Sequence, residues 1–591
     1  MFQKLKSYIL SLTIFFFPLF FLRTTQEFFL TNKLYLLCVA ALSLLLITSL
    51  EIFITRKIIF RLNGLAILRI LFLVSLFFSI MISSPNKVQA VLNPYFGFLG
   101  ILSLTVISFY INQVDLKITK ILSFSSLLLS LIMFFNFFKQ KGPFFSPLGT
   151  HLDLTILLGF SILTQIIAII SERVSLTKFK QRLIINLVIL GITSLGLVVS
   201  IYFLFKGALG IFPSFKYSFL TTIESLKNPL TALFGVGIDN YASGFTKIKD
   251  QAYNQSSLWQ ISFFNVSRST LLHVATEAGI LGLASLLALF FYCLKNSFDK
   301  AKIWTIPTLY LLIIFAIFPP SIPLFFLFFI SLAVIWPSTS EQMTRPSGGR
   351  IWRFSIITTI FLFVLPTGYF LGRSYIAEYY FKKSIDALVK NDAKGLYDNQ
   401  RLAIKSNPYI ERFRINFSQT NLLIANNLSK KSQKPSPEDQ EKIARLVQAA
   451  IAESKAVVTL NPQKASNWEN MANVYKTILK TAKGADSWAI SSYQRTINLD
   501  PQNPQYRLGL GGVYYSLDNF AEAIRQFEQA EVLKPGWPNA YFNLAWAYYK
   551  KGDSKKALKN MQTVISLLDP QKDKADIDRA KKDLEQFRGS L

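Results

Sequence analysis

Three residues whose side chains could do chemistry together lie close in the sequence: Arg268, His273 and Glu277. If residues 268–277 are helical, His273 and Glu277 are four positions apart and share one face of the helix. Arg268 then lies about a turn and a half earlier. A guanidinium group can hold a phosphate through two parallel hydrogen bonds, and a histidine or a carboxylate can take a proton from an attacking hydroxyl group. This spacing predicts a site that combines a cation, a base and an acid.

A second polar group lies in the stretch "PLGTHLDL", which contains His151 and Asp153. Asp153 could orient a base or bind a sugar hydroxyl. The alternative is a capped helix start, in which Thr150 or Asp153 satisfies free backbone amides. The only cysteines are Cys38 and Cys293, both inside apolar runs. We therefore expect neither a disulfide nor a Cys/His metal site, and no cofactor.

The elements that position these residues are apolar segments long enough to cross a membrane. Only 16% of the 591 residues are charged, against about 25% in soluble domains, which excludes an ordinary cytosolic enzyme. Of the net charge of +29, +19 lies in residues 1–373, in short clusters between apolar runs, so we expect no nucleic-acid partner. Eleven segments are predicted to span the bilayer: 7–23, 34–54, 64–83, 97–113, 121–138, 152–171, 183–205, 271–294, 303–319, 321–337 and 353–373.

The distribution of Lys and Arg among the short loops predicts the orientation of these segments. If the N-terminus is cytoplasmic, the inner loops carry 17 positive residues and the short outer loops carry five. Cytoplasmic loops are enriched in Lys and Arg. The long connection 206–270 and everything after the eleventh segment then face outward. Because this connection is rich in aromatic residues, we expect a folded cap with two short helices on the membrane surface. Gly235 and Gly237 are expected to mark a tight turn or a close backbone approach.

The tail, 374–591, shows a different pattern, with apolar residues at helical spacing and interleaved acids. The tripeptides "LNP", "LDP", "LKP" and "LDP" end at residues 462, 501, 535 and 570. Around them, small and aromatic residues recur at the same places in each unit. We expect three clear helical-hairpin units over 463–570, degenerate hairpins before them with a polar break at 430–441, and a polar capping helix at 571–591. The residues expected between layers are Tyr514, Phe527, Tyr548 and Met561.

These residues resemble two known families. The tail resembles the tetratricopeptide repeat (TPR), an α-solenoid that binds or spaces partners. The stretch from "PSFKYSF" through "ESLKNPLTALFGVGIDNYASGF" to "STLLHVATEAGILGLASLL" resembles the signature segment of the O-antigen ligase and O-antigen polymerase superfamily, with Glu277, Gly279 and Gly282 as its "ExGxxG" helix. The implied fold is an all-α polytopic bundle of about eleven transmembrane helices over 1–373, with a large extracytoplasmic loop, followed by an extracytoplasmic repeat domain over 374–591.

The resemblance implies a metal-independent glycosyltransferase in a bacterial cytoplasmic membrane. Such enzymes transfer or polymerise a glycan from an undecaprenyl-diphosphate carrier at the outer face. The acceptor is a glycan, a lipid or a protein, and the repeats could hold a protein partner. The implied catalytic residues are His273, Glu277 and Asp153. The implied diphosphate-binding residues are Arg268, Lys216, Lys227 and Lys247.

Two points are left open by the sequence. Ligases usually carry a His-Asn-like pair some nine residues before the glutamate, where this chain has Arg268 and Ser269. Either His273 takes the role of the base, or another group does, or the chain is not a ligase in the strict sense. The alternative function is a non-enzymatic membrane anchor whose repeats form a scaffold for assembly of the cell envelope.

The predicted orientation can be tested with single cysteines in the outer loop and the tail. Cysteine at Ser256 or at Ser516 should react with a membrane-impermeant thiol reagent in intact cells, because both positions are expected outside. Labelling of either position only after lysis would contradict the orientation.

Overall fold

The computed structural model describes residues 1–56, 58–60, 64–114, 116–139, 145–171, 176–208, 210–299, 304–335, 343–345, 350–430 and 436–590, and these are overwhelmingly helical. The strands within them form one short antiparallel pair, β1 (Ile58–Phe60) with β2 (Met343–Arg345). Both strands lie in loops that the charge bias assigns to the inner side. The all-α expectation is confirmed apart from this pair. Of the polar break expected at 430–441, residues 431–435 lie outside the described residues, and α19 begins at Pro437.

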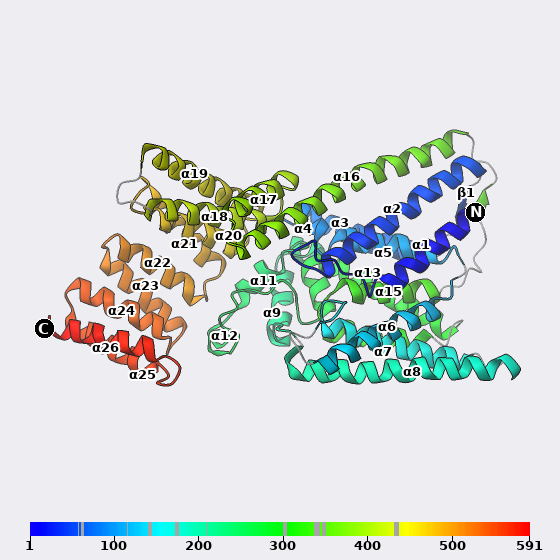
Figure 1. Cartoon of the computed structure of the whole chain (residues 1–591), viewed down its shortest axis with the longest axis horizontal. Helices are drawn as coiled ribbons and strands as arrows, with labels where there is room; N and C mark the ends of the chain where they lie inside the picture. The colour runs from blue at the N-terminus through cyan, green and yellow to red at the C-terminus, as the bar shows by residue number, and fades with distance from the viewer. Residues whose placement is uncertain are drawn as a thin grey trace. The chain divides into compact units, whose positions relative to one another are not determined.

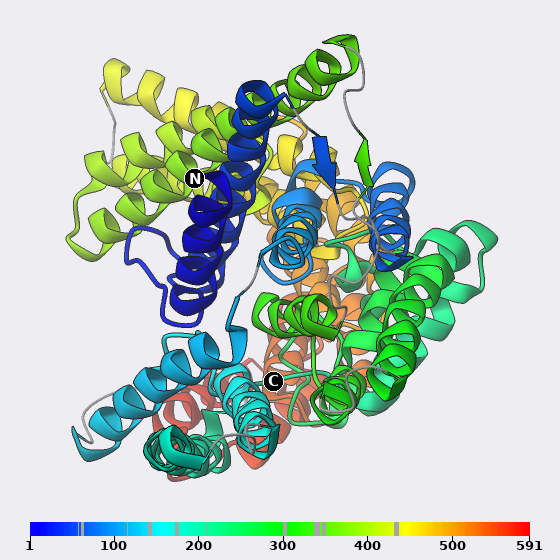
Figure 2. The ribbon, with the colours of Figure 1, turned by 90° about the vertical axis from the view of Figure 1, so that its right-hand side faces the viewer.

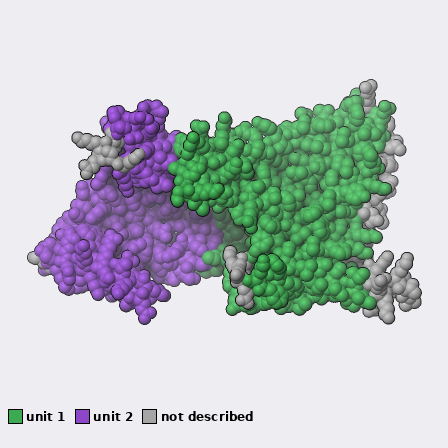
Figure 3. Space-filling model, in the orientation of Figure 1, with its two compact units in different colours: residues 1–241, 265–409 green, residues 242–264, 410–591 purple. Residues whose placement is uncertain are grey.

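The chain forms two compact units, and the boundary between them is not where the composition changes. One unit comprises residues 1–241 and 265–409, and the other comprises 242–264 and 410–591 (Figure 3). The boundary expected at 373/374 lies inside α16 (Arg350–Val389), which continues unbroken from the apolar segment into the tail. This helix ends where Asn391 adopts a positive φ and Asp392 caps the next helix. Residues 242–264 of the outer loop therefore belong to the unit of the repeats.

Each of the eleven predicted apolar segments coincides with a helix. The helices are α1 (Phe2–Phe16), α2 (Leu30–Thr55), α3 (Gly64–Ile82), α5 (Phe98–Ile111), α6 (Ile118–Lys139), α7 (His151–Ser171), α8 (Leu176–Phe203), α13 (Thr270–Asp299), α14 (Thr305–Ile317), α15 (Ile322–Ile335) and α16. Seven of them, within the described residues, are long and apolar enough to cross a membrane. The helices α1, α5, α14 and α15 are shorter, so the count of eleven spans stays a prediction.

The core of the first unit centres on α15, which is apolar on every side and buried along almost its whole length. A helix that is hydrophobic all round must lie inside the protein or in lipid. Its Phe328 ring stacks on Phe290 of α13 at 4.2 Å between centroids, and Phe325 meets Phe315 of α14. The helices α6, α7 and α8 pack together beside this core (Figures 1 and 2). Here α15 holds in place the helices that carry the candidate site.

The outer loop contains more helix than the sequence predicted. Four short helices follow η1 (Leu204–Ala208) instead of the two expected: α9 (Phe215–Leu226), α10 (Pro229–Phe234), α11 (Tyr241–Ile248) and α12 (Gln251–Gln255). Their starts carry polar caps, because Ser214, Asn228 and Asp250 each accept a hydrogen bond from a backbone amide of the helix that follows. Such caps satisfy amides that a helix leaves unpaired. A further short helix, α4 (Lys87–Leu92), precedes α5.

The tail consists of successive helical hairpins, as predicted. The clear units are α20 (Ala465–Thr477) with α21 (Ala485–Leu499), α22 (Pro504–Ser516) with α23 (Phe520–Leu533), and α24 (Pro538–Lys551) with α25 (Ser554–Leu567), followed by α26 (Lys574–Arg588). The helices α17 (Ala393–Ser406), α18 (Glu411–Lys430) and α19 (Pro437–Leu460) precede them. Of the residues expected between layers, Phe527 and Met561 are fully buried, whereas Tyr514 and Tyr548 are half-buried.

The repeat core also holds a carboxyl group whose ionisation should make stability depend on pH. Burial, assisted by the nearby Asp500, raises the pKa of Glu469 in α20 from 4.5 to about 7. The folded protein then keeps a proton that the unfolded chain releases. The free energy of unfolding should therefore fall as pH rises from about 4.5 to about 7, by about 3 kcal/mol for this group.

Replacing this carboxyl by an amide should remove that loss. We expect Glu469→Gln to be more stable than the wild type at pH 8 and similar to it at pH 4.5, measured by urea unfolding of the purified protein in detergent. Asp486→Asn, on the neighbouring helix α21, serves as the control. An identical pH dependence in Glu469→Gln and the wild type would contradict the assignment.

Candidate functional site

The segment after α10 approaches α13 so closely that only glycine fits on both sides. Gly279 has φ +68° and interrupts the helical backbone of α13. A Cβ atom there would lie 2.4 Å from the carbonyl oxygen of Leu233, and one at Gly235 would lie 2.2 Å from the carbonyl group of Glu277. Glycine alone tolerates both the positive φ and the contact. The close approach expected at Gly235 is confirmed, and so is that at Gly237, where a Cβ atom would lie 2.5 Å from the backbone of Ser84.

Hydrogen bonds fix this contact. The amide of Val236 donates to the carbonyl of Thr276 at 2.8 Å, and the amide of Gly237 donates to that of Glu277 at 3.2 Å. The hydroxyl of Ser79, on α3, donates to the same Glu277 carbonyl at 2.6 Å. The interrupted turn of α13 therefore finds partners for carbonyl groups that its own helix leaves free.

Glu277 and His273 form a buried pair at this point. Oε2 of Glu277 lies 3.2 Å from Nε2 of His273, and their side chains are 1% and 2% exposed. Oε1 accepts the backbone amides of Asn240 at 3.1 Å and Tyr241 at 3.0 Å, which begin α11. The predicted shared face is confirmed, and Glu277 also holds the start of the next loop helix.

The other nitrogen of His273 points toward the residues that lead into the helix. Nδ1 accepts the amide of Ser267 at 3.4 Å, which is long for such a bond. Because Nδ1 accepts there, the proton of a neutral ring lies on Nε2 and faces Glu277. The ring meets Phe96 edge-on and lies beside Tyr241, with 5.5 Å between centroids in each case.

Arg268 lies among aromatic rings. Its guanidinium carbon is 5.6 Å from the ring centroid of Phe212, 5.5 Å from that of Phe215 and 5.8 Å from that of Phe318. Such rings attract a cation through their negative faces. Its backbone amide donates to the hydroxyl of Ser218 on α9 at 3.0 Å. Within the described part of the chain, Arg268 makes no ion pair with a carboxylate, and it is only half-buried.

The three lysines predicted to accompany Arg268 lie in different surroundings. Lys216 is exposed on the first turn of α9, with Nζ 5.0 Å from the ring centroid of Tyr217. Lys227 is exposed and paired with Glu224 at 2.6 Å. Lys247 is exposed and belongs to the second compact unit. A diphosphate-binding role stays a prediction for all three.

Asp153 lies in the first turn of α7, at a helix start that is capped by a side chain. Its carboxylate accepts the hydroxyl of Thr150 at 2.7 Å and that of Ser321 at 2.6 Å, and its amide donates to Thr150 at 3.0 Å. Asp153 and His151 are both buried, and the His151 ring lies 5.1 Å from that of Phe203. The capping alternative is therefore confirmed for Thr150, while a catalytic role for Asp153 stays a prediction.

Two buried cations escaped sequence reasoning. Lys33, counted above as a loop charge, is fully buried at the start of α2 and donates to the carbonyls of Phe20 at 2.7 Å and Pro147 at 2.6 Å. Arg69 of α3 is 1% exposed, although a lone arginine near the inner face is expected to extend toward the headgroups. The signal available in the sequence was a charge within an apolar run.

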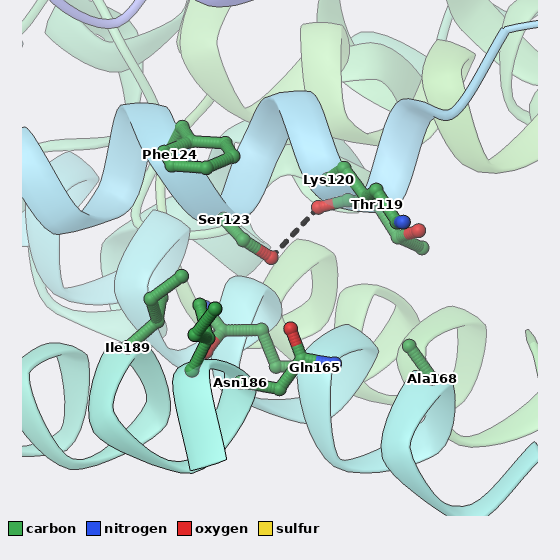
Figure 4. A pocket seen from close by; sticks show the side chains of 9 residues that line it. Thr119, Lys120, Ser123, Phe124, Gln165, Ala168, Asn186 and Ile189 are labelled. Carbon is green, nitrogen blue, oxygen red and sulfur yellow. Dashed lines mark hydrogen bonds between the residues drawn. The ribbon is translucent and has the colours of Figure 1, made fainter. Parts of the chain in front are cut away.

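A pocket of about 170 Å³ lies elsewhere, among α6, α7 and α8 (Figure 4). Lys120, Gln165 and Asn186 contribute its polar groups, and none of the candidate site residues lines it. Among the described residues, no group of three or more His, Cys, Asp or Glu side chains could hold a metal ion.

Comparison with known proteins supports the repeats. Residues 511–552 match the TPR repeat, so the tail contains at least one TPR unit. A search of curated proteins finds no match.

Similar solved structures include TPR proteins. A MamA protein shows 20% identity and TM-score 0.27, and the match covers 34% of this chain and 94% of the MamA chain. A thermophilic TPR protein of Thermus thermophilus shows 17% identity and TM-score 0.26, covering 36% of this chain and 98% of its own. MamA from Desulfovibrio magneticus RS-1 shows 16% identity and TM-score 0.25, covering 32% and 94%.

Removal of the Glu277 carboxylate should destabilise the site region. Glu277→Ala leaves the buried amides of Asn240 and Tyr241 without an acceptor, which should cost about 2–4 kcal/mol. Glu277→Gln keeps an oxygen that accepts them and should cost less. The measurement is the shift in thermal midpoint of the detergent-purified protein, with Glu224→Ala, from an exposed pair, as control. Equal midpoints for the alanine variant and the wild type would show that these bonds contribute little.

Proposed function

We propose that this chain is a multi-pass protein of a bacterial cytoplasmic membrane that transfers or polymerises a glycan from an undecaprenyl-diphosphate donor at the outer face. The observation that carries the proposal is Arg268, a half-buried cation with no carboxylate partner among the described residues. Three aromatic rings surround it, and it lies five residues before His273 of the buried His273–Glu277 pair. A structural arginine at such a place is normally neutralised by an acid. An arginine without one has its charge available for an anionic ligand.

We assign Arg268 to the stabilisation of the diphosphate leaving group. In the transfer step, the hydroxyl oxygen of the acceptor forms a bond to the anomeric carbon of the donor sugar, and the bond from that carbon to the diphosphate oxygen breaks. The diphosphate leaves with both electrons of the broken bond, and Arg268 stabilises the charge that develops there. Lys216 lies on α9, the helix that also binds the Arg268 backbone through Ser218, and is the second cation we assign to the diphosphate.

The proton of the acceptor hydroxyl needs a base, and the contacts favour His273 over Glu277. Oε1 of Glu277 accepts two backbone amides, which holds the carboxylate with Oε2 at 3.2 Å from His273 Nε2. Glu277 therefore orients the ring, as a carboxylate does for a catalytic histidine. Nδ1 of His273 has only the long contact with the Ser267 amide, so Nδ1 is the atom that we assign to take the proton. We assign no step to Asp153, because its two oxygens accept the hydroxyl groups of Thr150 and Ser321.

A second function is favoured by a different observation. His273 is 2% exposed and has a partner at each nitrogen, which also suits a purely structural residue. Together with the TPR repeat, this supports a membrane-anchored scaffold for envelope assembly that binds partners without catalysis.

Transfer by membranes that contain Arg268 variants separates the two functions. With an undecaprenyl-diphosphate oligosaccharide as donor, Arg268→Ala should reduce the rate on the order of 10²–10³-fold, because a donor to transition-state charge is lost. Arg268→Lys keeps the charge without the planar pair of donors, so its transfer rate should lie between those of the wild type and Arg268→Ala. Lys87→Ala, an exposed cation at the start of α4, should transfer at the wild-type rate. Equal rates for the wild type and Arg268→Ala would contradict the site, and absence of transfer by the wild type would favour the scaffold.

A further inference from the structure

The middle of the outer loop, residues 242–264, has a small core of its own inside the second compact unit (Figure 3). Phe245 meets Tyr253 at 5.6 Å and Phe264 at 5.2 Å between ring centroids, and all three are buried. The Tyr253 hydroxyl lies 3.0 Å from the carbonyl oxygen of Leu258 and 2.7 Å from that of Ile261. This ordered segment packs on the repeats.

The segment contacts the turns that connect one repeat to the next. Nδ2 of Asn254 donates to the carbonyl of Gln502 at 2.7 Å and to that of Leu533 at 3.0 Å, and Asn254 is 1% exposed. Gln502 follows α21, and Leu533 ends α23, so one side chain binds the chain at the ends of two successive repeats. Gln251 adds a bond from Nε2 to the carbonyl of Val532 at 2.9 Å.

A buried ion pair joins the segment to the first of these turns. Nζ of Lys249 lies 2.6 Å from Oδ2 of Asp500, and the two side chains are 2% and 0% exposed. Lys249 also donates to the carbonyl of Ser262 at 2.9 Å, and Asp500 accepts from Asn503 at 3.3 Å. Loss of one member of such a pair leaves an uncompensated buried charge, whereas loss of both is often tolerated.

Charge fixes where along the repeats the segment lies. The residue before proline in the recurring tripeptides is Asn461, Asp500, Lys534 and Asp569 in successive turns. Lys249 meets the acid at 500, while the cation at 534 lies 5.2 Å from the ring centroid of Trp259. Trp259 in turn meets Trp537 edge-on at 5.3 Å. If the segment were shifted by one repeat toward the C-terminus, Lys249 would face Lys534. Trp259 would then be separated from Trp537.

We propose that the turn edge of the TPR domain is a receptor for this chain's own segment 242–264, and that Lys249 and Asp500 are positioning residues for the reaction. The positioning role of Lys249 and Asp500 rests on the proposed function. The segment begins directly after Tyr241, whose amide is held by Glu277, and ends three residues before Ser267, whose amide contacts His273. Its attachment to the repeats therefore restrains both chain ends that lead into the site.

Hydrogen exchange of the full-length protein in detergent tests the receptor without any assay of transfer. Lys249→Met and Asp500→Asn should each accelerate exchange of the amides in 251–264 on the order of 10²-fold, since each leaves one buried member unpaired. The double variant Lys249→Met/Asp500→Asn should return to within a few-fold of the wild type. Lys551→Met, an exposed lysine of α24, is the control, and Asn254→Ala loosens the segment from the loop side should Asp500→Asn unfold the repeats.

Each outcome bears on one step. Unchanged exchange in 251–264 for Lys249→Met and Asn254→Ala would overturn the receptor, and a double variant as fast as the singles would overturn the pairing. Faster exchange in 251–264 without faster exchange at Tyr241 and 265–270 would overturn the positioning role.

The transfer assay tests the positioning role a second time. The single variants should lose at least tenfold in kcat, with recovery in the double variant, and an unchanged kcat would also overturn the positioning role. Absence of transfer by the wild type contradicts the proposed function alone, because the exchange comparison still decides the receptor.

Discussion

A side chain at position 279 would collide with the carbonyl oxygen of Leu233, so the loop after α10 reaches α13 only because both contact points are glycines. The positive φ of Gly279 interrupts the helix two residues after Glu277. The freed carbonyls of Thr276 and Glu277 then bind amides of the loop, and the Glu277 carboxylate binds the start of α11. The geometry around His273 follows from this backbone contact.

The first unit also shows how a largely apolar bundle accommodates charge. Lys33 and Asp153 are buried near helix starts, and each has two partners among carbonyl or hydroxyl groups. A buried charge without such partners would be very costly. Arg268 differs, because aromatic faces surround it and no carboxylate among the described residues neutralises it. That contrast separates the cation we assign to a ligand from those that hold the bundle together.

The outer loop is divided between the two compact units, which gives the repeats a role within the chain itself. Its ends lie with the apolar helices of the first unit, and its middle packs on turns between repeats. Repeat domains usually bind partners along extended surfaces. Here part of that surface, the turn edge at 500–503 and 532–537, already holds an internal segment through Lys249, Asn254 and Trp259. A partner of the repeats and the conformation of the loop could therefore influence each other.

The sequence by itself determined the features that depend on local periodicity. Apolar runs predicted the apolar helices of the first unit, and the recurring tripeptides predicted the hairpins of the tail, because helices and repeats are set by neighbours a few residues apart. The i, i+4 spacing likewise predicted that His273 and Glu277 share a face. Tertiary structure alone decided that Glu277 binds the amides of residues 240 and 241, that Lys33 is buried, and that 242–264 joins the repeats. These contacts join residues from 36 to more than 250 positions apart, and no local pattern specifies which distant carbonyl, amide or carboxylate a polar side chain will meet when it is buried.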